Sequence, residues 1–330
     1  GFIGPWTGTN DGDPIVRYDK EADRWLASQF AINTTDDTFW QLIAISETRD
    51  PLGAYYQYAF QFPAFNDYPK IGIWPDGYYA TFNMFGEYNR TAAAAFDRDR
   101  MLAGDPDAQM ILFDMPEGTI VFNALPSDFD GPLPPDGTPN YMVFFKDDAW
   151  GFAFDQLRIW EFNADWEEPS NSTFQEAFVL ATEPFTAQLC EAPRWQCIPQ
   201  PFTGTRLEAI SDRLMYRLQY RNFGSHASMV TNHTVNADGM EKAGVRWYEL
   251  RDDYDGNGWY IYQQGTYAPD DNSRWMGTTA MNGKGTIALG FTVSSDTIFP
   301  SMRYTGRTED APLGEMNMME IEIIAGTGSQ

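Results

Sequence analysis

The chain has 330 residues and a formal charge of −25, from 47 Asp and Glu against 22 Lys and Arg. A field of this sign repels phosphate backbones and anionic lipid surfaces, so we expect no nucleic-acid partner. No run of 18 apolar residues occurs, which argues against membrane insertion. Aromatic residues make up 16% of the chain, a proportion typical of strands packed face to face.

The first sixty residues predict four strands, at 14–19, 24–32, 39–47 and 54–62, which alternate apolar and polar residues between turn-forming clusters. The same order of strands and turns recurs near the C-terminus. The repeat includes an acid-Pro-Leu-Gly turn, which is Asp50-Pro51-Leu52-Gly53 in the first copy and Asp310-Ala311-Pro312-Leu313-Gly314 in the second. A four-strand unit repeated at both ends of one chain predicts an all-β fold, the β-propeller.

Between these copies the pattern predicts more strands and a few irregular segments. Pro75-Asp76-Gly77 predicts a hairpin turn, and the Ala-rich stretch 91–104 predicts a helical turn or two that Gly104 ends. Residues 119–140 carry Pro, Gly and Asp and predict a long exposed loop. Further strands are expected at 141–148, 154–166 and 172–180.

We therefore predict one β-propeller domain over residues 1–330. Its four-stranded antiparallel blades are expected near 10–63, 64–117, 118–184, 206–266 and 270–330, with a cysteine loop at 186–205. The five blades form either the whole ring or part of a six- or seven-bladed ring. The chain begins in strand material and stops just after a strand, so we expect a mature or trimmed fragment.

The only two cysteines, Cys190 and Cys197, are close enough in sequence to close a small disulfide loop, as in a secreted protein. A pair of reduced, buried thiols is the alternative. Four Asn-x-Ser/Thr sequons are compatible with a secreted glycoprotein in a eukaryotic host. They begin at Asn33, Asn89, Asn171 and Asn232.

The innermost strand of each propeller blade lines a central channel, so residues at the starts of these strands are the candidate site. Here these residues are Asp13, Asp67, Lys70, Asp212, Arg213, Arg274 and Trp275. Converging Asp, Arg and Lys side chains hold a carboxylate, a sugar or a cation. The alternative is that they pair with one another and satisfy the strand ends.

At these residues the chain resembles a known group of proteins. The pattern Asp13-Pro14-x-Val16-x-Tyr18-Asp19, followed by Arg24-Trp25, is similar to blades of exported bacterial β-propellers of the sialidase-type, or BNR-like, repeat group. The stretches 211–226, 230–235 and 266–285 look like the same exported proteins. The resemblance implies a propeller along nearly the whole chain, and its motifs are specific for the fold and not for an activity.

Sialidase activity would require an arginine triad, for which the resemblance offers Arg213, Arg274 and Arg303. The chain lacks the Arg-Ile-Pro signature and an intact Ser-x-Asp-x-Gly-x-x-Trp box. Asp67 and Asp212 are candidates for the two carboxylates that glycoside cleavage uses.

Calcium is the candidate cofactor. Asp253, Asp255 and Asn257 match the first half of an EF-hand loop, although Gln264 stands where that loop has a bidentate Glu. An ordinary hairpin turn is the alternative interpretation. His226 and His233 lie seven residues apart and are expected on opposite faces of a strand.

From these features we expect a secreted or cell-surface propeller with a binding or structural role. Its expected partners are a glycan, an extracellular protein or another copy of itself. The alternative is a carbohydrate-active enzyme, a glycosidase that uses carboxylates in the channel.

Overall fold

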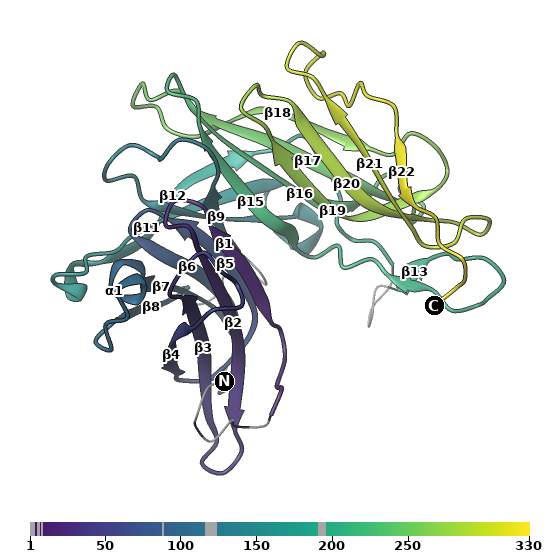
Figure 1. Ribbon diagram of the computed structural model, residues 1–330. Coiled ribbons are helices and arrows are strands. Elements are labelled where there is room, and N and C mark those ends of the chain that lie inside the picture. Colours follow the sequence, from purple (N-terminus) through teal and green to yellow (C-terminus); the bar gives the residue numbers. More distant parts are fainter. Residues whose placement is uncertain (1–3, 5–6, 8, 88, 116–123, 191–195) are drawn as a thin grey trace. The chain divides into compact units, whose positions relative to one another are not determined.

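The computed structural model describes residues 4, 7, 9–87, 89–115, 124–190 and 196–330 (Figure 1). Over these residues the fold is almost entirely β. The strands up to the cysteine loop are β1 (Ile15–Asp19), β2 (Arg24–Asn33), β3 (Thr38–Ser46), β4 (Tyr55–Phe62), β5 (Phe65–Trp74), β6 (Gly77–Phe85), β7 (Arg90–Asp97), β8 (Met110–Asp114), β9 (Leu125–Phe129), β10 (Asn140–Lys146), β11 (Gln156–Asn163) and β12 (Thr173–Ala181).

The later strands are β13 (Gln196–Ile198), β14 (Leu207–Glu208), β15 (Leu214–Asn222), β16 (Ala227–Asn236), β17 (Ala243–Asp252), β18 (Tyr260–Tyr267), β19 (Ser273–Met281), β20 (Ile287–Ser294), β21 (Ser301–Arg307) and β22 (Ile321–Ile324). One short helix, α1 (Arg98–Ala103), and two 3-10 turns, Asp148–Trp150 and Pro169–Asn171, complete the described elements.

Consecutive strands pair in groups of four. The sheets β1-β2-β3-β4, β5-β6-β7-β8 and β19-β20-β21-β22 each follow chain order, with antiparallel pairing throughout the registers described. An eight-stranded sheet has the order β12-β11-β10-β9-β15-β16-β17-β18, in which β9 and β15 run parallel. The prediction of an all-β fold built from four-stranded antiparallel units of the β-propeller type is confirmed.

The chain divides into two compact units. Unit 1 comprises Gly1–Pro126, Pro139–Met142 and Glu161–Gln175, and unit 2 comprises Ser127–Thr138, Val143–Trp160 and Glu176–Gln330. The single ring and its blade number stay predictions.

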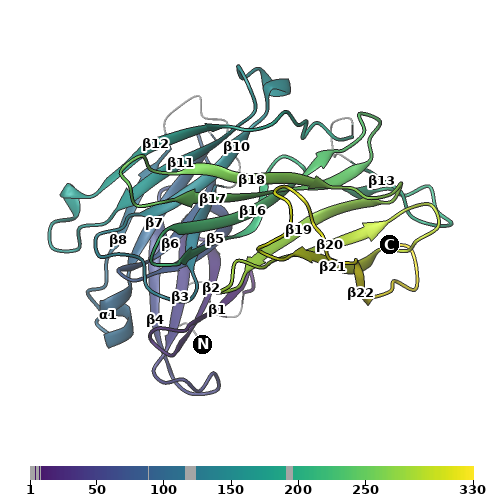
Figure 2. The same cartoon turned by 90° about the horizontal axis from the view of Figure 1, so that it is seen from above.

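Each unit has its own apolar core. In unit 1, β6 and the alanines of β7 are buried along nearly their whole length. In unit 2, Val230, Trp247, Leu289 and Phe291 belong to one cluster, and Figure 2 shows β16 and β17 lying alongside β19 and β20. The burial of both faces explains why the sequence of β7 reads as an apolar run and not as strict alternation.

Two local predictions were wrong. Residues 91–97, expected to be helical, belong to strand β7, and only 98–103 form a helix, which ends at Gly104 with a φ of 72° as expected. Residues 125–129, expected in an exposed loop, form the buried strand β9. In both cases pairing with neighbouring strands outweighs the local preference of the sequence for helix or loop. The first part of that predicted loop, 119–123, lies outside the described residues.

In three groups of four consecutive strands, β5–β8, β15–β18 and β19–β22, the first strand carries a register shift, the mark of a β-bulge. The shift lies between Asp67 and Lys70 in β5, between Met215 and Gln219 in β15, and between Trp275 and Thr278 in β19. A bulge bends its strand and turns side chains away from the regular alternation. A β-bulge therefore recurs in the first strand of each of these three four-stranded groups.

Candidate functional site

In unit 1 the bulge of β5 contains two of the predicted site residues, Asp67 and Lys70. Tyr68, between them, has a φ of 54°, and all three side chains are half-buried. Lys70 Nζ lies 3.3 Å from the centroid of the Tyr68 ring and donates a hydrogen bond to the Pro69 carbonyl at 3.0 Å. The bulge thus presents a tyrosine ring and an ammonium group together.

In unit 2 the bulge of β15 contains Tyr216 and Arg217, both half-buried. The Arg217 guanidinium pairs with two carboxylates. Asp128 lies on β9, and Asp130 directly follows that strand. Gln219 donates to Asp130 Oδ2 at 2.7 Å and to the Met281 carbonyl at 3.1 Å. Residues two apart on a strand share a face, so one guanidinium bridges both carboxylates.

This cluster is ionic and mostly out of solvent. Burial works against the charge of Arg217, but Asp128 and Asp130 outweigh it and raise the pKa of this guanidinium above its ordinary value. The Arg217 side chain keeps 20% of its surface exposed, whereas that of Asp128 keeps 1%. The ion pairs therefore fix the position of the Arg217 guanidinium, while part of the side chain stays in contact with solvent.

The other predicted residues of unit 2 pair with nearby acids. Arg213 Nε lies 2.8 Å from Asp212 Oδ1. Arg274, almost fully buried, contacts Asp270 at 2.7 Å and Glu320 at 2.8 Å, and Arg303 contacts the same Glu320 at 2.9 Å. The three arginines offered for a sialidase triad thus each have a carboxylate partner within unit 2.

Trp275 is a buried core residue that packs against the cysteine loop. Asp13 is exposed in the turn before β1, with a φ of 47°. Asp13 and Asp67 belong to unit 1, and Asp212 belongs to unit 2. The convergence of these strand starts on one channel therefore stays a prediction.

The acidic turn proposed for calcium is held by its own hydrogen bonds. Asp255 accepts from the backbone N–H of Asn257 at 2.9 Å and from its side chain at 2.8 Å, and these bonds lower the pKa of Asp255. Asp253 accepts from the Tyr260 hydroxyl at 3.0 Å. These contacts build the β17–β18 hairpin, and calcium binding here stays a prediction.

A second group of acids, Asp147, Asp148 and Asp155, could hold a cation, because one oxygen from each lies within 4.8 Å of the others. Asp147 accepts N–H bonds from Ala149 and Ala187, at 2.7 and 2.6 Å. Burial, together with the charges of the neighbouring acids, raises the pKa of Asp147. These three acids are a second candidate cation position, which the sequence pattern did not indicate.

The cysteine prediction is confirmed, since Cys190 and Cys197 are bonded, with their Cα atoms 5.2 Å apart. Of the four sequons, Asn89 and Asn171 are exposed. Asn232 is fully buried in β16 and Asn33 is 6% exposed, so neither has room for a glycan in the folded protein. Glycosylation at the exposed pair stays a prediction.

The two histidines differ in their surroundings. His226 stacks on Phe223 in a half-buried position before β16, whereas His233 is fully buried within that strand. Among the described residues, no helix is long and apolar enough to cross a membrane.

The sequence patterns did not reveal Asp128, Asp130 and Arg217. The Pro and Gly residues around 125–137 indicated a loop and hid a short strand in which Ser127 and Phe129 alternate with the two acids. Acids two residues apart also occur at other places, such as Asp97 and Asp99 or Asp253 and Asp255, so this spacing does not single out the cluster.

Neither a protein-family model nor a curated protein matches the sequence. Among solved structures, an endo-arabinase from Bacteroides thetaiotaomicron matches with a TM-score of 0.39 and 11% identity, over 96% of this chain and 100% of that chain. A thermostable family-43 glycoside hydrolase gives 0.38 and 11%, over 96% of each chain. A complex of BT0996 with RGII gives 0.37 and 10%, over 93% of this chain and 89% of that chain. The sialidase-type affiliation of this protein stays a prediction.

Proposed function

We propose that this protein is carbohydrate-active and binds glycans at the bulged strands β5 and β15. The observation that carries the proposal is that two bulges each contain a tyrosine and a cation, Tyr68 and Lys70 in β5 and Tyr216 and Arg217 in β15. A sugar ring offers an apolar face of C–H groups and a rim of hydroxyls. An aromatic ring beside fixed charged groups matches both.

The charged groups at these bulges are already held in position. Arg217 is oriented by Asp128 and Asp130, and the Lys70 ammonium rests over the Tyr68 ring. Groups that are ordered before binding lose little conformational entropy when a ligand arrives. This favours a weak polar ligand such as a sugar, whose contacts are individually small.

The proposed glycan is neutral. The formal charge of −25 produces a potential that repels uronate-rich, sulfated or sialylated chains. A neutral polysaccharide experiences no such repulsion.

Hydrolysis is the second candidate, favoured by the two carboxylates, those of Asp128 and Asp130, that pair with the one Arg217 guanidinium. Glycosidases use a pair of carboxyl groups, one as an acid and one as a base or nucleophile. Because Arg217 pairs with both carboxylates, the cluster suits a base or nucleophile with its supporting group. The proton donor would come from another residue, such as the predicted Asp212.

The proposed setting is outside the cytoplasm. The Cys190–Cys197 disulfide supports this setting, since such bonds persist in oxidising compartments. Assembly with an extracellular protein or with a second copy of the chain is the alternative proposal.

The test is a panel of neutral and acidic polysaccharides, measured by affinity gel electrophoresis and calorimetry, with release of reducing ends as the readout of hydrolysis. Lys70→Met keeps most of the apolar stem and removes the charge, and we expect it to weaken binding about fivefold. Lys284→Met, in the exposed turn before β20, is the matched control and should bind as the parent does. Equal loss in both variants, or binding of acidic glycans only, would overturn the proposal.

A further inference from the structure

The last sheet of unit 2, β19 to β22, exposes one of its two faces. The inner face, with Leu289 and Phe291, belongs to the core cluster that also contains residues of β16 and β17. The strand registers place the alternate residues on the opposite face, which we call the C-terminal face. Its exposed and half-buried residues are Thr278, Ala280, Ala288, Gly290, Thr292, Met302, Tyr304, Ile321 and Ile324.

The first sheet of unit 1, β1 to β4, has a face of the same kind. Its inner face contacts the following sheet, where Phe30 lies against Phe65 with ring centroids 5.1 Å apart. The strand registers define the opposite face, which we call the N-terminal face. Its exposed and half-buried residues are Val16, Tyr18, Trp25, Ala27, Gln29, Tyr55, Gln57, Ala59 and Gln61.

None of the residues named for these two faces is charged, although 21% of the chain is Asp, Glu, Lys or Arg. Several of the side chains are large and apolar, and Val16 is 65% exposed and Ile324 59% exposed. Contiguous uncharged surface of this kind marks a place where a soluble protein contacts a partner.

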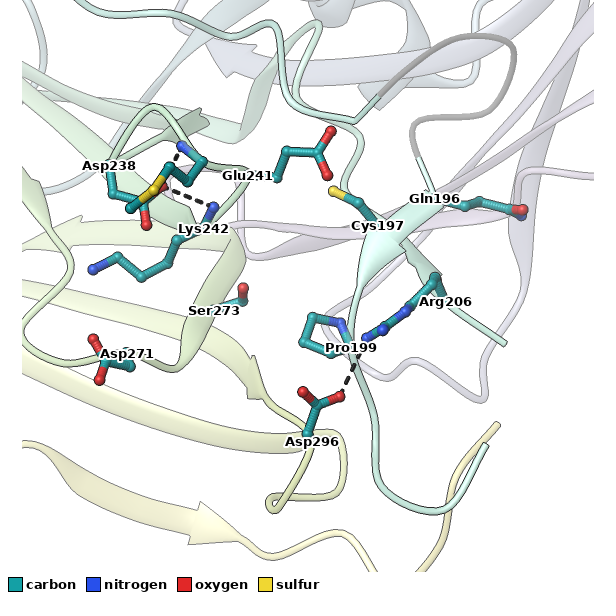
Figure 3. Close-up of a pocket in the computed structure, with 11 residues that line it drawn as sticks. Gln196, Cys197, Pro199, Arg206, Asp238, Glu241, Lys242, Asp271, Ser273 and Asp296 are labelled. Carbon is teal, nitrogen blue, oxygen red and sulfur yellow. Dashed lines mark hydrogen bonds and ion pairs between the residues drawn. The ribbon is translucent and has the colours of Figure 1, made fainter. Parts of the chain in front are cut away.

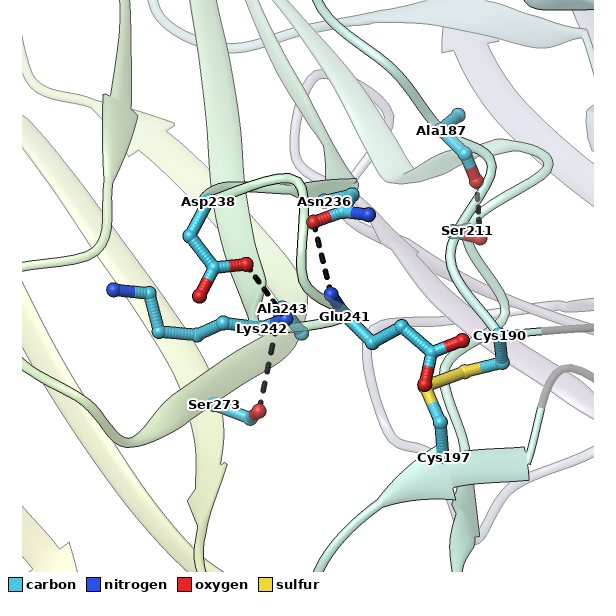
Figure 4. Close-up of a disulfide and its surroundings, with 10 residues drawn as sticks. All are labelled: Ala187, Cys190, Cys197, Ser211, Asn236, Asp238, Glu241, Lys242, Ala243 and Ser273. Atoms are coloured by element: carbon cyan, nitrogen blue, oxygen red, sulfur yellow. Dashed lines mark hydrogen bonds between the residues drawn. A yellow bond between two sulfur atoms is a disulfide. The ribbon is translucent and has the colours of Figure 1, made fainter.

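Other exposed parts of unit 2 are strongly charged. An open pocket of about 480 Å³ is lined by the strand after the cysteine loop, the β16–β17 hairpin and the start of β19 (Figure 3). Six of its eleven lining residues are Asp, Glu, Lys or Arg. Figure 4 shows Glu241 beside the Cys190–Cys197 disulfide, on the same hairpin as Asp238 and Lys242. The uncharged C-terminal face is therefore a feature of its own sheet and not of the surface of unit 2 in general.

The two uncharged faces belong to the first and last sheets of a chain built from repeated four-stranded sheets. Repeat arrays stay soluble when their terminal repeats have a polar outer face, because these repeats have no further neighbour. The terminal sheets of this chain lack such charged faces. Within unit 2 the last sheet already packs its inner face on another sheet, through Leu289 and Trp247. An exposed face of the same type is suited to the same kind of contact.

We propose that the N-terminal face of one molecule packs on the C-terminal face of a second copy of this chain. Charge favours this pairing, because molecules of charge −25 repel one another and approach most easily where neither surface is charged. Four strands about 4.8 Å apart and about six residues long cover roughly 400 Å². Two such faces bury about 800 Å² in total, the size of a weak and reversible contact. This assembly goes beyond the glycan binding proposed for β5 and β15 and does not depend on it.

Sedimentation equilibrium over a range of protein concentrations tests the association. We expect the average mass to rise with concentration, with a dissociation constant on the order of 100 μM for a contact of this size. Added salt should strengthen the association, since it screens the net negative charge and there are no ion pairs between the two faces to weaken. A parent protein that stays monomeric at about ten times that concentration would overturn the proposal.

Two charge variants test which faces meet. Gln57→Lys places a charge on the N-terminal face and Thr278→Lys places one on the C-terminal face, both at exposed positions. Each variant alone should associate at least about tenfold more weakly, because the contact would bury an unpaired ammonium. An equimolar mixture should form a dimer, since each variant keeps the face that the other has lost. Ser170→Lys, in the exposed turn before β12, is the control and should associate as the parent does.

The mixture separates this pairing from the alternatives, once equal denaturation midpoints verify folding. Undiminished self-association of either variant would mean that like faces meet, and a mixture that stays monomeric would mean that the two faces do not meet. Weaker binding of a neutral polysaccharide by both variants, with a monomeric parent, would assign the faces to a glycan. Each of these three results would overturn the proposal.

Discussion

Arg98 Nε lies 2.7 Å from Asp19 Oδ2, and this ion pair joins the end of β1 to the start of α1 within unit 1. The Tyr78 hydroxyl donates to the same carboxylate at 3.0 Å. Both charged side chains are out of solvent, with 5% and 0% of their surfaces exposed. The pair thus ties the first four-stranded sheet to the second.

Removing one partner of this pair should be costly. We expect Asp19→Asn to lower the free energy of unfolding by about 3–5 kcal/mol, because the buried guanidinium then loses its buried counter-charge and keeps only the partly exposed Glu21. Chemical denaturation followed by tryptophan fluorescence measures the change. Glu21→Gln is the control: Glu21 contacts the same guanidinium but is 44% exposed, so its loss should cost less than about 1 kcal/mol. Similar losses in the two variants would contradict this account.

His233 makes stability depend on pH. Its ring is fully buried, stacks on Phe145 at 4.2 Å, and has Nε2 3.0 Å from the Tyr248 hydroxyl. Burial, and then the charge of Arg246, lower the pKa of His233 to about 3. The folded protein therefore keeps His233 neutral at pH values where the unfolded chain, with an ordinary pKa of 6.5, takes up a proton.

The sign follows from linkage. Because the unfolded state binds more protons between pH 6.5 and about 3, His233 costs stability as the pH falls through this window, by up to about 1.4 kcal/mol per pH unit. We expect His233→Gln to be less stable at pH 7 and to lose less stability than the parent on acidification to pH 4.5. The half-buried His226→Gln should change the slope far less. Parallel pH profiles for parent and His233→Gln would show that the imidazole is protonated in the folded state.

Alternation and turn chemistry predicted the first sheet well. Strands β1 to β4 lie within a residue or two of the predicted segments, because one face of each strand is apolar and each turn contains Asp, Gly or Pro. The stretch Ala92–Ala95 went wrong for a physical reason. Alanine favours helix in isolation, but here the backbone of β7 pairs with β6 on one side and with β8 on the other, and this pairing outweighs the local preference.

The candidate site was predicted less completely. Asp67 and Lys70 were found because they sit at the start of a recognisable strand, where the structure has a bulge. Asp128 and Arg217 were not, because their partnership depends on the parallel pairing of β9 with β15, two strands far apart in sequence that no local pattern connects. Arg213, Arg274 and Arg303 were identified as candidate site residues, but the sequence alone did not show which carboxylates they pair with.

The β17–β18 hairpin offers a matched pair of glycines. Both have positive φ, 86° at Gly256 and 76° at Gly258. A Cβ at Gly256 would meet nothing within 4 Å, whereas one at Gly258 would lie 2.3 Å from Phe178 Cε1. We expect Gly256→Ala to cost about 1 kcal/mol from backbone strain alone, and Gly258→Ala about 2–4 kcal/mol, since the phenyl ring must also move. Thermal denaturation of the two variants measures the difference, and equal costs would mean that Phe178 yields freely.

The disulfide should raise the free energy of unfolding of unit 2 only modestly, because the loop that it closes is short. Cys190 and Cys197 are seven residues apart, so closing the loop removes only a little entropy from the unfolded chain, worth about 2 kcal/mol. We expect the Cys190→Ser, Cys197→Ser double variant to lose about this much and to become insensitive to reductant. Denaturation with and without a phosphine reductant measures both effects. The contradicting outcome is a parent protein that is equally stable with and without reductant, although a thiol assay shows that its cysteines are reduced. In that case the buried contacts of the loop with Trp275 and Leu189, and not the covalent bond, would hold the loop in place.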